Sequence, residues 1–202
     1  MRSALRDVFE TLILTVIIFL LVRSVVQNFK VEGQSMEPSL HNGQYLLINK
    51  AVYWRIGENV ASRLFPKAVP DGDAVYVFRG PQRGDIIVFR YPKDLSRDFI
   101  KRVIALPGDT VEIKEGHVYV NNSQLDEGYL TDQPHYSEAA QKIPPAQYFV
   151  LGDNRNASSD SHVWGLVPEE NIIGKAWVTY WPVDQLGIVP NVALVDQLQR
   201  SH

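Results

Sequence analysis

The longest apolar run of the chain lies near its N-terminus. The twelve residues between Glu10 and Arg23 are all apolar or threonine. As a helix they would rise about 18 Å, which is short of the roughly 30 Å hydrocarbon core of a bilayer. A helix from Leu5 to Val26 is long enough if the charged side chains near its ends reach the interfaces. The pattern therefore predicts a membrane anchor helix within residues 1–28.

Two other interpretations of this segment remain open. A cleaved signal peptide would need a small-x-small site after the apolar run, and residues 23–27 offer none. A buried helix of a soluble protein would have to be apolar on all sides. We favour the uncleaved anchor. Its orientation is not set by charge, because Arg2 and Arg6 on one side balance Arg23 and Lys30 on the other.

Beyond residue 30, apolar residues no longer recur with the spacing of a helix. They form short continuous runs, or runs that alternate with polar residues. Turn signals such as Asn42-Gly43 and Pro107-Gly108-Asp109 separate these runs. We expect strands at residues 45–48, 75–78, 86–89, 103–106, 148–151 and 172–181, and a hairpin of residues 110–113 and 117–120. The pattern predicts a mainly β domain over residues 29–187, followed by a C-terminal tail at 188–202.

Two stretches interrupt the strand pattern. Residues 121–146 are polar and contain prolines, so we expect a loop-rich excursion over about 111–147. Residues 51–82 suggest an insertion whose apolar side chains would contact either the membrane surface or, as we favour, the core. These side chains are Tyr53, Trp54, Leu64 and Phe65. Residues 192–199 are compatible with a short terminal helix.

Composition narrows the range of functions. A length of 202 residues suggests one domain with a substantial core. The net charge of -3 gives no reason to expect nucleic-acid binding. The absence of cysteine excludes disulfides, a thiol nucleophile and cysteine metal sites. The five histidines are scattered and form no His-Glu-x-x-His pair that could hold zinc, so we do not expect a metal enzyme.

Ser35 lies where a hydroxyl could be presented to a substrate. Residues 33–40, Gly-Gln-Ser-Met-Glu-Pro-Ser-Leu, follow the apolar segment and precede an expected strand. Glycine allows close approach of a ligand to the backbone, and Pro38 fixes a turn. A lone serine is more often a surface residue, and a nucleophilic serine needs a base. No histidine lies in a convincing motif, but a lysine can serve if burial lowers its pKa from about 10.4 to about 7–8.

Lys101 is the candidate base. Residues 99–106 are typical of a strand, whose period of two places Lys101 on one face with Phe99, Val103 and Ala105. An ammonium group among apolar side chains is costly unless it loses its proton or finds a partner. The alternative is a solvated lysine on an edge strand, and periodicity alone favours that alternative. A third segment, residues 152–165, is rich in polar side chains that fit an ordered loop beside a site, or simply a structural turn cluster.

Together these segments resemble the bacterial type I signal peptidases. Ser-Met-Glu-Pro-Ser-Leu at 35–40 is similar to the nucleophile segment of that family, and Arg-Gly-Asp-Ile-Ile-Val-Phe at 83–89 to one of its strands. Lys-Arg-Val-Ile-Ala-Leu-Pro-Gly-Asp at 101–109 is similar to the segment with the base, and residues 152–165 to the Gly-Asp-Asn-Arg segment. The order of the motifs and the anchor also match, over roughly residues 5–185. This resemblance outweighs the solvated-lysine alternative.

The resemblance implies an antiparallel coiled β-sheet protease with a Ser/Lys dyad and no cofactor. Such an enzyme removes signal peptides from exported preproteins on the outer side of the bacterial cytoplasmic membrane, so its partners would be signal peptides and membrane lipid. Ser35 would be the nucleophile, Lys101 the general base, and Ser158 the serine that orients the lysine. The Ser35 backbone N–H would donate to the oxyanion, whereas Gly33 lacks the hydroxyl that some relatives place there.

Further residues receive roles from the same resemblance. Shallow pockets for small side chains, one and three positions before the cut, would be lined by Val31, Met36, Phe99 and Ile100. Three charged residues would support the site structurally: Asp153, Arg155 and Asp160. His162 stands where the family usually has arginine. We expect it either to pair with Asp160 or to face solvent, in which case Arg155 alone would serve Asp160.

Three rival functions agree less well with the sequence. A self-cleaving regulator with a Ser/Lys dyad would carry a DNA-binding segment in place of the anchor, and nothing basic is present. Penicillin-binding enzymes use a Ser-x-x-Lys tetrad, which does not occur here. A catalytically inactive, membrane-tethered binding module is disfavoured because Ser35, Lys101 and Ser158 are all retained.

Overall fold

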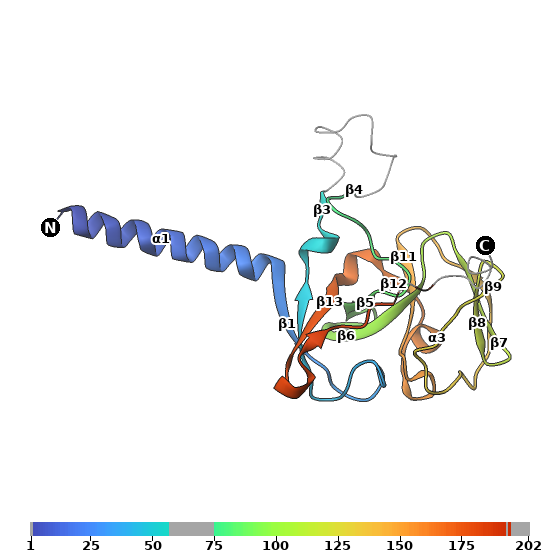
Figure 1. Ribbon diagram of the computed structural model, residues 1–202. Helices are drawn as coiled ribbons and strands as arrows, with labels where there is room; N and C mark the ends of the chain where they lie inside the picture. Colours follow the sequence, from blue (N-terminus) through green and yellow to red (C-terminus); the bar gives the residue numbers. More distant parts are fainter. Residues whose placement is uncertain (1, 57–74, 193, 195–202) are drawn as a thin grey trace, which may run out of the picture.

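A long helix extends away from a β domain (Figure 1). The computed structural model describes residues 2–56, 75–192 and 194. Helix α1 spans Arg2–Val25. Its segment Arg6–Val25 is long and apolar enough to cross a membrane, and none of that segment is buried against the other residues that the structure describes. An apolar helix without a protein partner is the arrangement expected of an anchor rather than of a core helix.

The predicted anchor of residues 1–28 extends too far. The helix ends at Val25, and Val26–Lys30 continues directly as strand β1. The carbonyl oxygen of Val25 accepts a hydrogen bond from the Lys50 backbone N–H at 2.8 Å, and pairing between Val26 and Asn49 follows at once. The helix therefore ends at Val25 because the residues that follow form hydrogen bonds with the neighbouring strand of residues 45–49.

The main sheet has eight strands, and the expectation of a mainly β, antiparallel domain is confirmed. Its order is β1-β2-β13-β5-β6-β11-β12, with β14 paired to β13, and every pairing is antiparallel. The strands are β1, β2 (Tyr45–Asn49), β5 (Ile86–Tyr91), β6 (Asp94–Ala105), β11 (Gln147–Leu151), β12 (Val167–Pro168), β13 (Ile172–Trp181) and β14 (Gly187–Ile188). Strand β6 lies between β5 and β11, so its C-terminal half is a central strand of the sheet.

A second sheet occupies the predicted loop-rich excursion of residues 111–147, which is therefore more ordered than expected. It has the order β10-β7-β8-β9. Its strands are β7 (Thr110–Lys114), β8 (His117–Val120), β9 (Ser123–Gln124) and β10 (Glu138–Lys142). The predicted hairpin forms from β7 and β8. Alternate side chains of that hairpin, such as Val111 and Val118, are buried in one cluster with Ile104 and Phe149 of the main sheet.

Short elements complete the fold. They are η1 (Ala51–Tyr53), β3 (Arg55–Ile56), β4 (Val75–Tyr76), η2 (Arg155–Ala157), α3 (Ser161–Trp164), η3 (Glu169–Asn171) and η4 (Val183–Gln185). The expected strand at 75–78 is shortened to β4. Of the aromatic residues in the insertion, Tyr53 is buried and donates its hydroxyl to Asp85 at 2.7 Å, whereas Trp54 is exposed. Leu64 and Phe65 lie outside the described residues.

The predicted tail of residues 188–202 begins too early. Val189 is buried in the core, and the Asn191 side chain accepts a hydrogen bond from the Ile86 backbone N–H at 2.8 Å. Leu194 is also buried. Val189 and Leu194 pack into two different apolar clusters of the β domain, so these residues belong to its core rather than to a tail. The helix expected at 192–199 lies almost entirely outside the described residues.

Candidate active site

Ser35 lies in a tight turn that follows strand β1. Gly33 adopts a φ of 85°, a conformation that glycine reaches without steric cost, and its N–H donates to Asn42 Oδ1 at 2.9 Å. The carbonyl oxygen of Ser35 accepts from the Asn154 backbone N–H at 3.1 Å, which joins the turn to the polar loop of residues 152–165. The Ser35 N–H makes no hydrogen bond within the described residues. The turn thus presents both the hydroxyl and a free amide.

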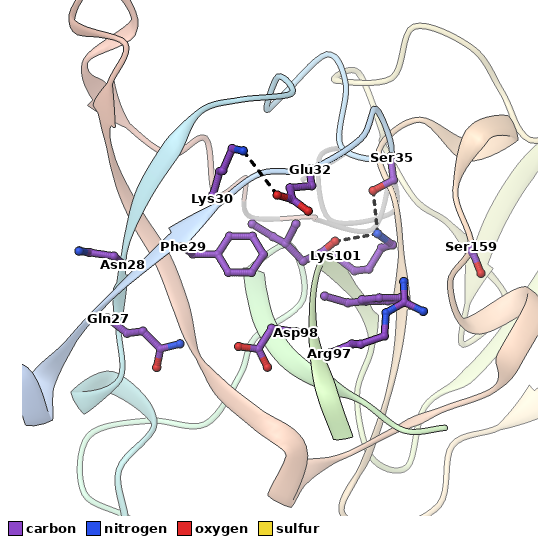
Figure 2. A pocket seen from close by; sticks show the side chains of 12 residues that line it. Gln27, Asn28, Phe29, Lys30, Glu32, Ser35, Arg97, Asp98, Lys101 and Ser159 are labelled. Atoms are coloured by element: carbon purple, nitrogen blue, oxygen red, sulfur yellow. Dashed lines mark hydrogen bonds and ion pairs between the residues drawn. The ribbon is translucent and has the colours of Figure 1, made fainter. Parts of the chain in front are cut away.

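Lys101 projects from β6 toward this hydroxyl (Figure 2). Its Nζ lies 2.8 Å from Ser35 Oγ and donates to the Ile100 carbonyl oxygen at 2.8 Å. The residue is 4% exposed. The structure therefore brings together the predicted nucleophile and base, although 66 positions separate them in the chain. The bond to Ile100 holds the amine at a fixed rotamer beside the serine.

The environment of Lys101 brings the pKa of its amine down to a range in which the neutral form is accessible near physiological pH. Burial lowers the pKa of the amine to about 8, although the carboxylates of Asp160 and Asp153 oppose this shift. The Phe99 ring centroid lies 5.7 Å from Nζ. An amine with a pKa near the working pH is well matched to general-base catalysis.

A cleft of about 540 Å³ opens in front of the dyad. It is lined by Gln27, Asn28, Phe29, Lys30, Glu32, Ser35, Arg97, Asp98, Phe99, Ile100, Lys101 and Ser159. Figure 2 shows Ser35 and Lys101 on one side and the β1 residues Gln27, Asn28 and Phe29 on the other. Strand β1 pairs with β2 along one edge, so its opposite edge borders the cleft. The cleft thus runs between segments of β1 and β6, which suits an extended peptide.

The four predicted pocket residues separate into two groups. Phe99 and Ile100 line the cleft. Val31 and Met36 do not line it, because they are 2% and 1% exposed and lie in the same buried cluster as Ile100. Both therefore lie behind the wall of the cleft, packed in the same cluster as Ile100. The sequence could not distinguish these positions, since all four are apolar residues close to Ser35 or Lys101.

Ser158 does not make the predicted hydrogen bond to Lys101. Its Oγ is buried and has no partner among the described residues. The side chain lies against Gly152, where a Cβ atom would collide with Ser158 Oγ and with the Ser35 carbonyl oxygen. The amine already donates to the Ile100 carbonyl and lies beside Ser35, so the Ser158 hydroxyl remains next to the dyad but unbonded.

The three predicted structural residues are themselves buried, and each has a charged or titratable side-chain partner. Asp153 forms an ion pair with Arg102, and Arg155 pairs with Glu127. Asp160 contacts His162, whose Nδ1 lies 2.7 Å from Asp160 Oδ1. The expected pairing of Asp160 with His162 is therefore present, and Arg155 serves a different carboxylate.

Sequence reasoning did not find Arg102 and Glu127. For Arg102 a signal existed, because the side chain after Lys101 on a strand must point to the opposite face, which in a central strand is the core. Glu127 lies in a polar stretch without a periodic pattern, 28 positions from its partner Arg155. Within the part of the chain that the structure describes, no group of three or more His, Asp or Glu side chains is placed to hold a metal ion.

Comparison with known proteins gives a consistent result. The model of the family described as "Signal peptidase, peptidase S26" matches residues 5–181. A relative from Synechocystis sp. named "Probable signal peptidase I-2" is 38% identical over 198 residues, which cover 95% of this chain and 80% of the relative. Signal peptidase I of Leptolyngbya laminosa is 37% identical over 193 residues, 92% of this chain and 84% of the relative. Signal peptidase I of Pseudomonas aeruginosa is 34% identical over 220 residues, 88% of this chain and 74% of the relative.

Proposed function

This chain belongs to the signal peptidase family, peptidase S26, and on that premise we propose that Ser35 is its nucleophile and Lys101 its general base. It is a membrane-associated serine endopeptidase that removes signal peptides from preproteins. The observation that carries the residue assignment is the 2.8 Å approach of a buried lysine amine to a serine hydroxyl at the wall of a peptide-sized cleft.

The proposed reaction begins with the neutral amine of Lys101. As Ser35 Oγ bonds to the scissile carbonyl carbon, the hydroxyl proton passes to Nζ. The ammonium then gives this proton to the leaving nitrogen as the C–N bond breaks, which leaves an ester on Ser35. Water hydrolyses that ester by the same route, losing a proton to Lys101 while Ser35 recovers one.

The developing oxyanion needs a hydrogen-bond donor. The Ser35 backbone N–H supports this role because it has no partner within the described residues and belongs to the nucleophile itself. Gly33 supplies no side-chain donor, and its own N–H is already bonded to Asn42. Ser158 Oγ, buried beside the Ser35 carbonyl without a partner, is free to bond to Lys101 once the serine hydroxyl has lost its proton.

Substrate selection is assigned to the wall of the cleft. Phe99 and Ile100 are in position to meet the side chains one and three residues before the cut, since successive side chains of an extended peptide alternate in direction. Val31 and Met36 support that wall from behind. Asp153, Arg155 and Asp160 are proposed to hold the loop of residues 152–165 in place.

The helix is proposed to act as a single-pass anchor in a bacterial cytoplasmic membrane, with the protease domain of residues 29–187 on the extracytoplasmic side. Its apolar side chains support contact with lipid because they are exposed along the whole span. The β13–β14 region presents further exposed apolar side chains, and we propose lipid contact there too. They are Trp177, Trp181, Val183, Leu186 and Ile188, between 48% and 80% exposed.

A peptide assay tests the residue assignment. The full chain in detergent should cleave a fluorogenic peptide that has alanine one and three positions before the cut. Variants S35A and K101A should lose that cleavage while keeping the circular dichroism spectrum of the parent chain. Cleavage by either variant at the parental rate would remove the corresponding residue from the catalytic role.

The membrane side can be tested with cysteine labelling, since the chain contains no native cysteine. Ser137 is exposed in the β domain. In spheroplasts, whose cytoplasmic membrane is intact, S137C should react with a membrane-impermeant maleimide. S3C should react only after the membrane has been permeabilised. The reverse pattern would place the protease domain in the cytoplasm.

A further inference from the structure

His162 lies at the start of α3, in contact with a buried carboxylate. Its Nδ1 is 2.7 Å from Asp160 Oδ1, and its side chain is 18% exposed while that of Asp160 is fully buried. The imidazole also stacks on the Tyr136 ring, with centroids 3.9 Å apart and an angle of 10° between the planes. Because a carboxylate accepts hydrogen bonds, the proton of a neutral His162 resides on Nδ1. The side chain therefore donates to Asp160 in both of its charge states.

Asp160 connects this histidine to the dyad. Its second oxygen, Oδ2, accepts from the Gly152 backbone N–H at 2.9 Å. Gly152 lies so close to the Ser35 carbonyl oxygen and to Ser158 Oγ that no side chain could be accommodated there. A shift of the Asp160 carboxylate would therefore move the Gly152 backbone against the residue that carries the nucleophile.

Asp160 also acts on Lys101 through its charge. Its carboxylate favours the ammonium form of Lys101, as does that of Asp153, and opposes the effect of burial. Tyr136 is the titratable group that faces His162 from the other side, and the pKa of its phenol is raised by burial and by Asp160. The other charges that act on Tyr136 are Arg155, Glu127 and Glu138.

We propose that His162 is a positioning residue for the cleavage reaction and that it acts through Asp160. It holds the Asp160 carboxylate against the Gly152 backbone, and it modifies the negative charge that Lys101 experiences. This proposal rests on the proposed roles of Ser35 and Lys101. The Nδ1–H donor keeps the Asp160 carboxylate on Gly152. A positive charge on the side chain at position 162 offsets the charge of that carboxylate, so Lys101 then loses its proton more readily.

Two substitutions separate the donor from the charge. H162N keeps an N–H donor close to the position of Nδ1 but is never charged, whereas H162R keeps a donor with a permanent positive charge. H162L keeps apolar contact with Tyr136 and removes the donor. His135 provides a matched control, because its side chain is exposed and its structural hydrogen bond, to Asn156, comes from the backbone N–H.

The experiment measures kcat/KM and kcat of the full chain in detergent from pH 5 to 10, together with the melting temperature of each variant. We expect kcat/KM to rise with pH at least ~0.3 pH units lower in H162R than in H162N. The arginine offsets the charge of Asp160, whereas the asparagine does not. We expect H162L to lose about tenfold in kcat and H162N to recover most of this loss. H135L should match the parent chain in both measurements.

Other outcomes would overturn the proposal. If kcat/KM rises over the same pH range in H162R and H162N, the charge of residue 162 does not affect the pKa of Lys101. If H162L lowers only the melting temperature and keeps the parental kcat and pH profile, His162 is merely structural. Failure of both H162N and H162R to fold would also contradict it, because either side chain should serve Asp160. If the parent chain cleaves and S35A does not, the proposed function stands whatever these variants do.

Discussion

Arg102 and Asp153 form a bidentate ion pair in which both side chains are completely buried. Arg102 Nε donates to Asp153 Oδ1 at 2.8 Å, and Nη2 donates to Oδ2 at 2.6 Å. The remaining N–H groups of Arg102 donate to the carbonyl oxygens of Gly84 and Pro190 and to Ser39 Oγ. Because Arg102 follows Lys101 on β6, this cluster fixes the strand from behind, on the face opposite the cleft.

Loss of this pair should be strongly destabilising. D153A would leave the Arg102 guanidinium buried without a counter-charge, so we expect the free energy of unfolding to fall by about 3–5 kcal/mol. Denaturant unfolding of the full chain in detergent measures this change. The matched control is E112A, which removes a surface pair with Lys114 (2.7 Å), and it should cost less than about 1 kcal/mol. Similar losses in the two variants would contradict the buried-pair interpretation.

Ser35 and Lys101 should act as one catalytic unit. Each of S35A and K101A should reduce cleavage to background, and the double variant should be no slower than either single variant. K101R should also be inactive, because a guanidinium group does not lose its proton at accessible pH. Single-turnover rates with one peptide measure all four variants. Substantial turnover by K101R would remove Lys101 from the general-base role.

The pH dependence of cleavage should follow the amine of Lys101. Burial lowers the pKa of this group to about 8, and only the neutral amine can take the serine proton. Activity should therefore rise with pH through about 8 and then level off. Well below this pKa, kcat/KM should fall about tenfold for each pH unit. A profile that peaks near pH 5, with a limb typical of histidine, would indicate a different base.

The periodic parts of the fold were predictable from the sequence. Strands β2, β5, β11 and β13 are apolar runs between turn signals, and the hairpin of β7 and β8 alternates regularly. The first half of β6 was missed because residues 94–98 are polar apart from Leu95 and are all exposed. Their sequence therefore shows no alternation of buried and exposed positions. That half is a strand because it pairs with β5, a tertiary constraint that local propensity does not report.

The site was predictable only in part, for a similar reason. Periodicity alone favoured a solvated Lys101, and its burial follows from the position of β6 between β5 and β11. The resemblance pointed to segments that the structure brings together around the contact between Ser35 and Lys101, but not to the atoms within them. Ser158 makes no bond to Lys101 in this structure, and Val31 and Met36 lie behind the cleft wall. Such details depend on how side chains from distant segments pack, and a sequence motif does not encode those distances.

Selectivity for small side chains should follow from the rigidity of the cleft wall. Phe99 cannot easily move aside, because its ring stacks on Tyr91 with centroids 4.6 Å apart and contacts the Phe89 ring edge-on at 6.4 Å. Ile100 is 5% exposed and packs into the apolar cluster that contains Val31 and Met36. A larger substrate side chain at this wall would therefore meet packed groups, and overpacking costs about 1–3 kcal/mol.

A peptide series measures this selectivity. Replacing alanine by leucine one or three positions before the cut should lower kcat/KM by roughly 5- to 150-fold, which corresponds to that cost. The same replacement two positions before the cut is the matched control. In an extended peptide that side chain points away from the wall, so its effect should be small. Equal losses at all three positions would show that the wall of Phe99 and Ile100 does not select, because only an alternating pattern matches a strand held between β1 and β6.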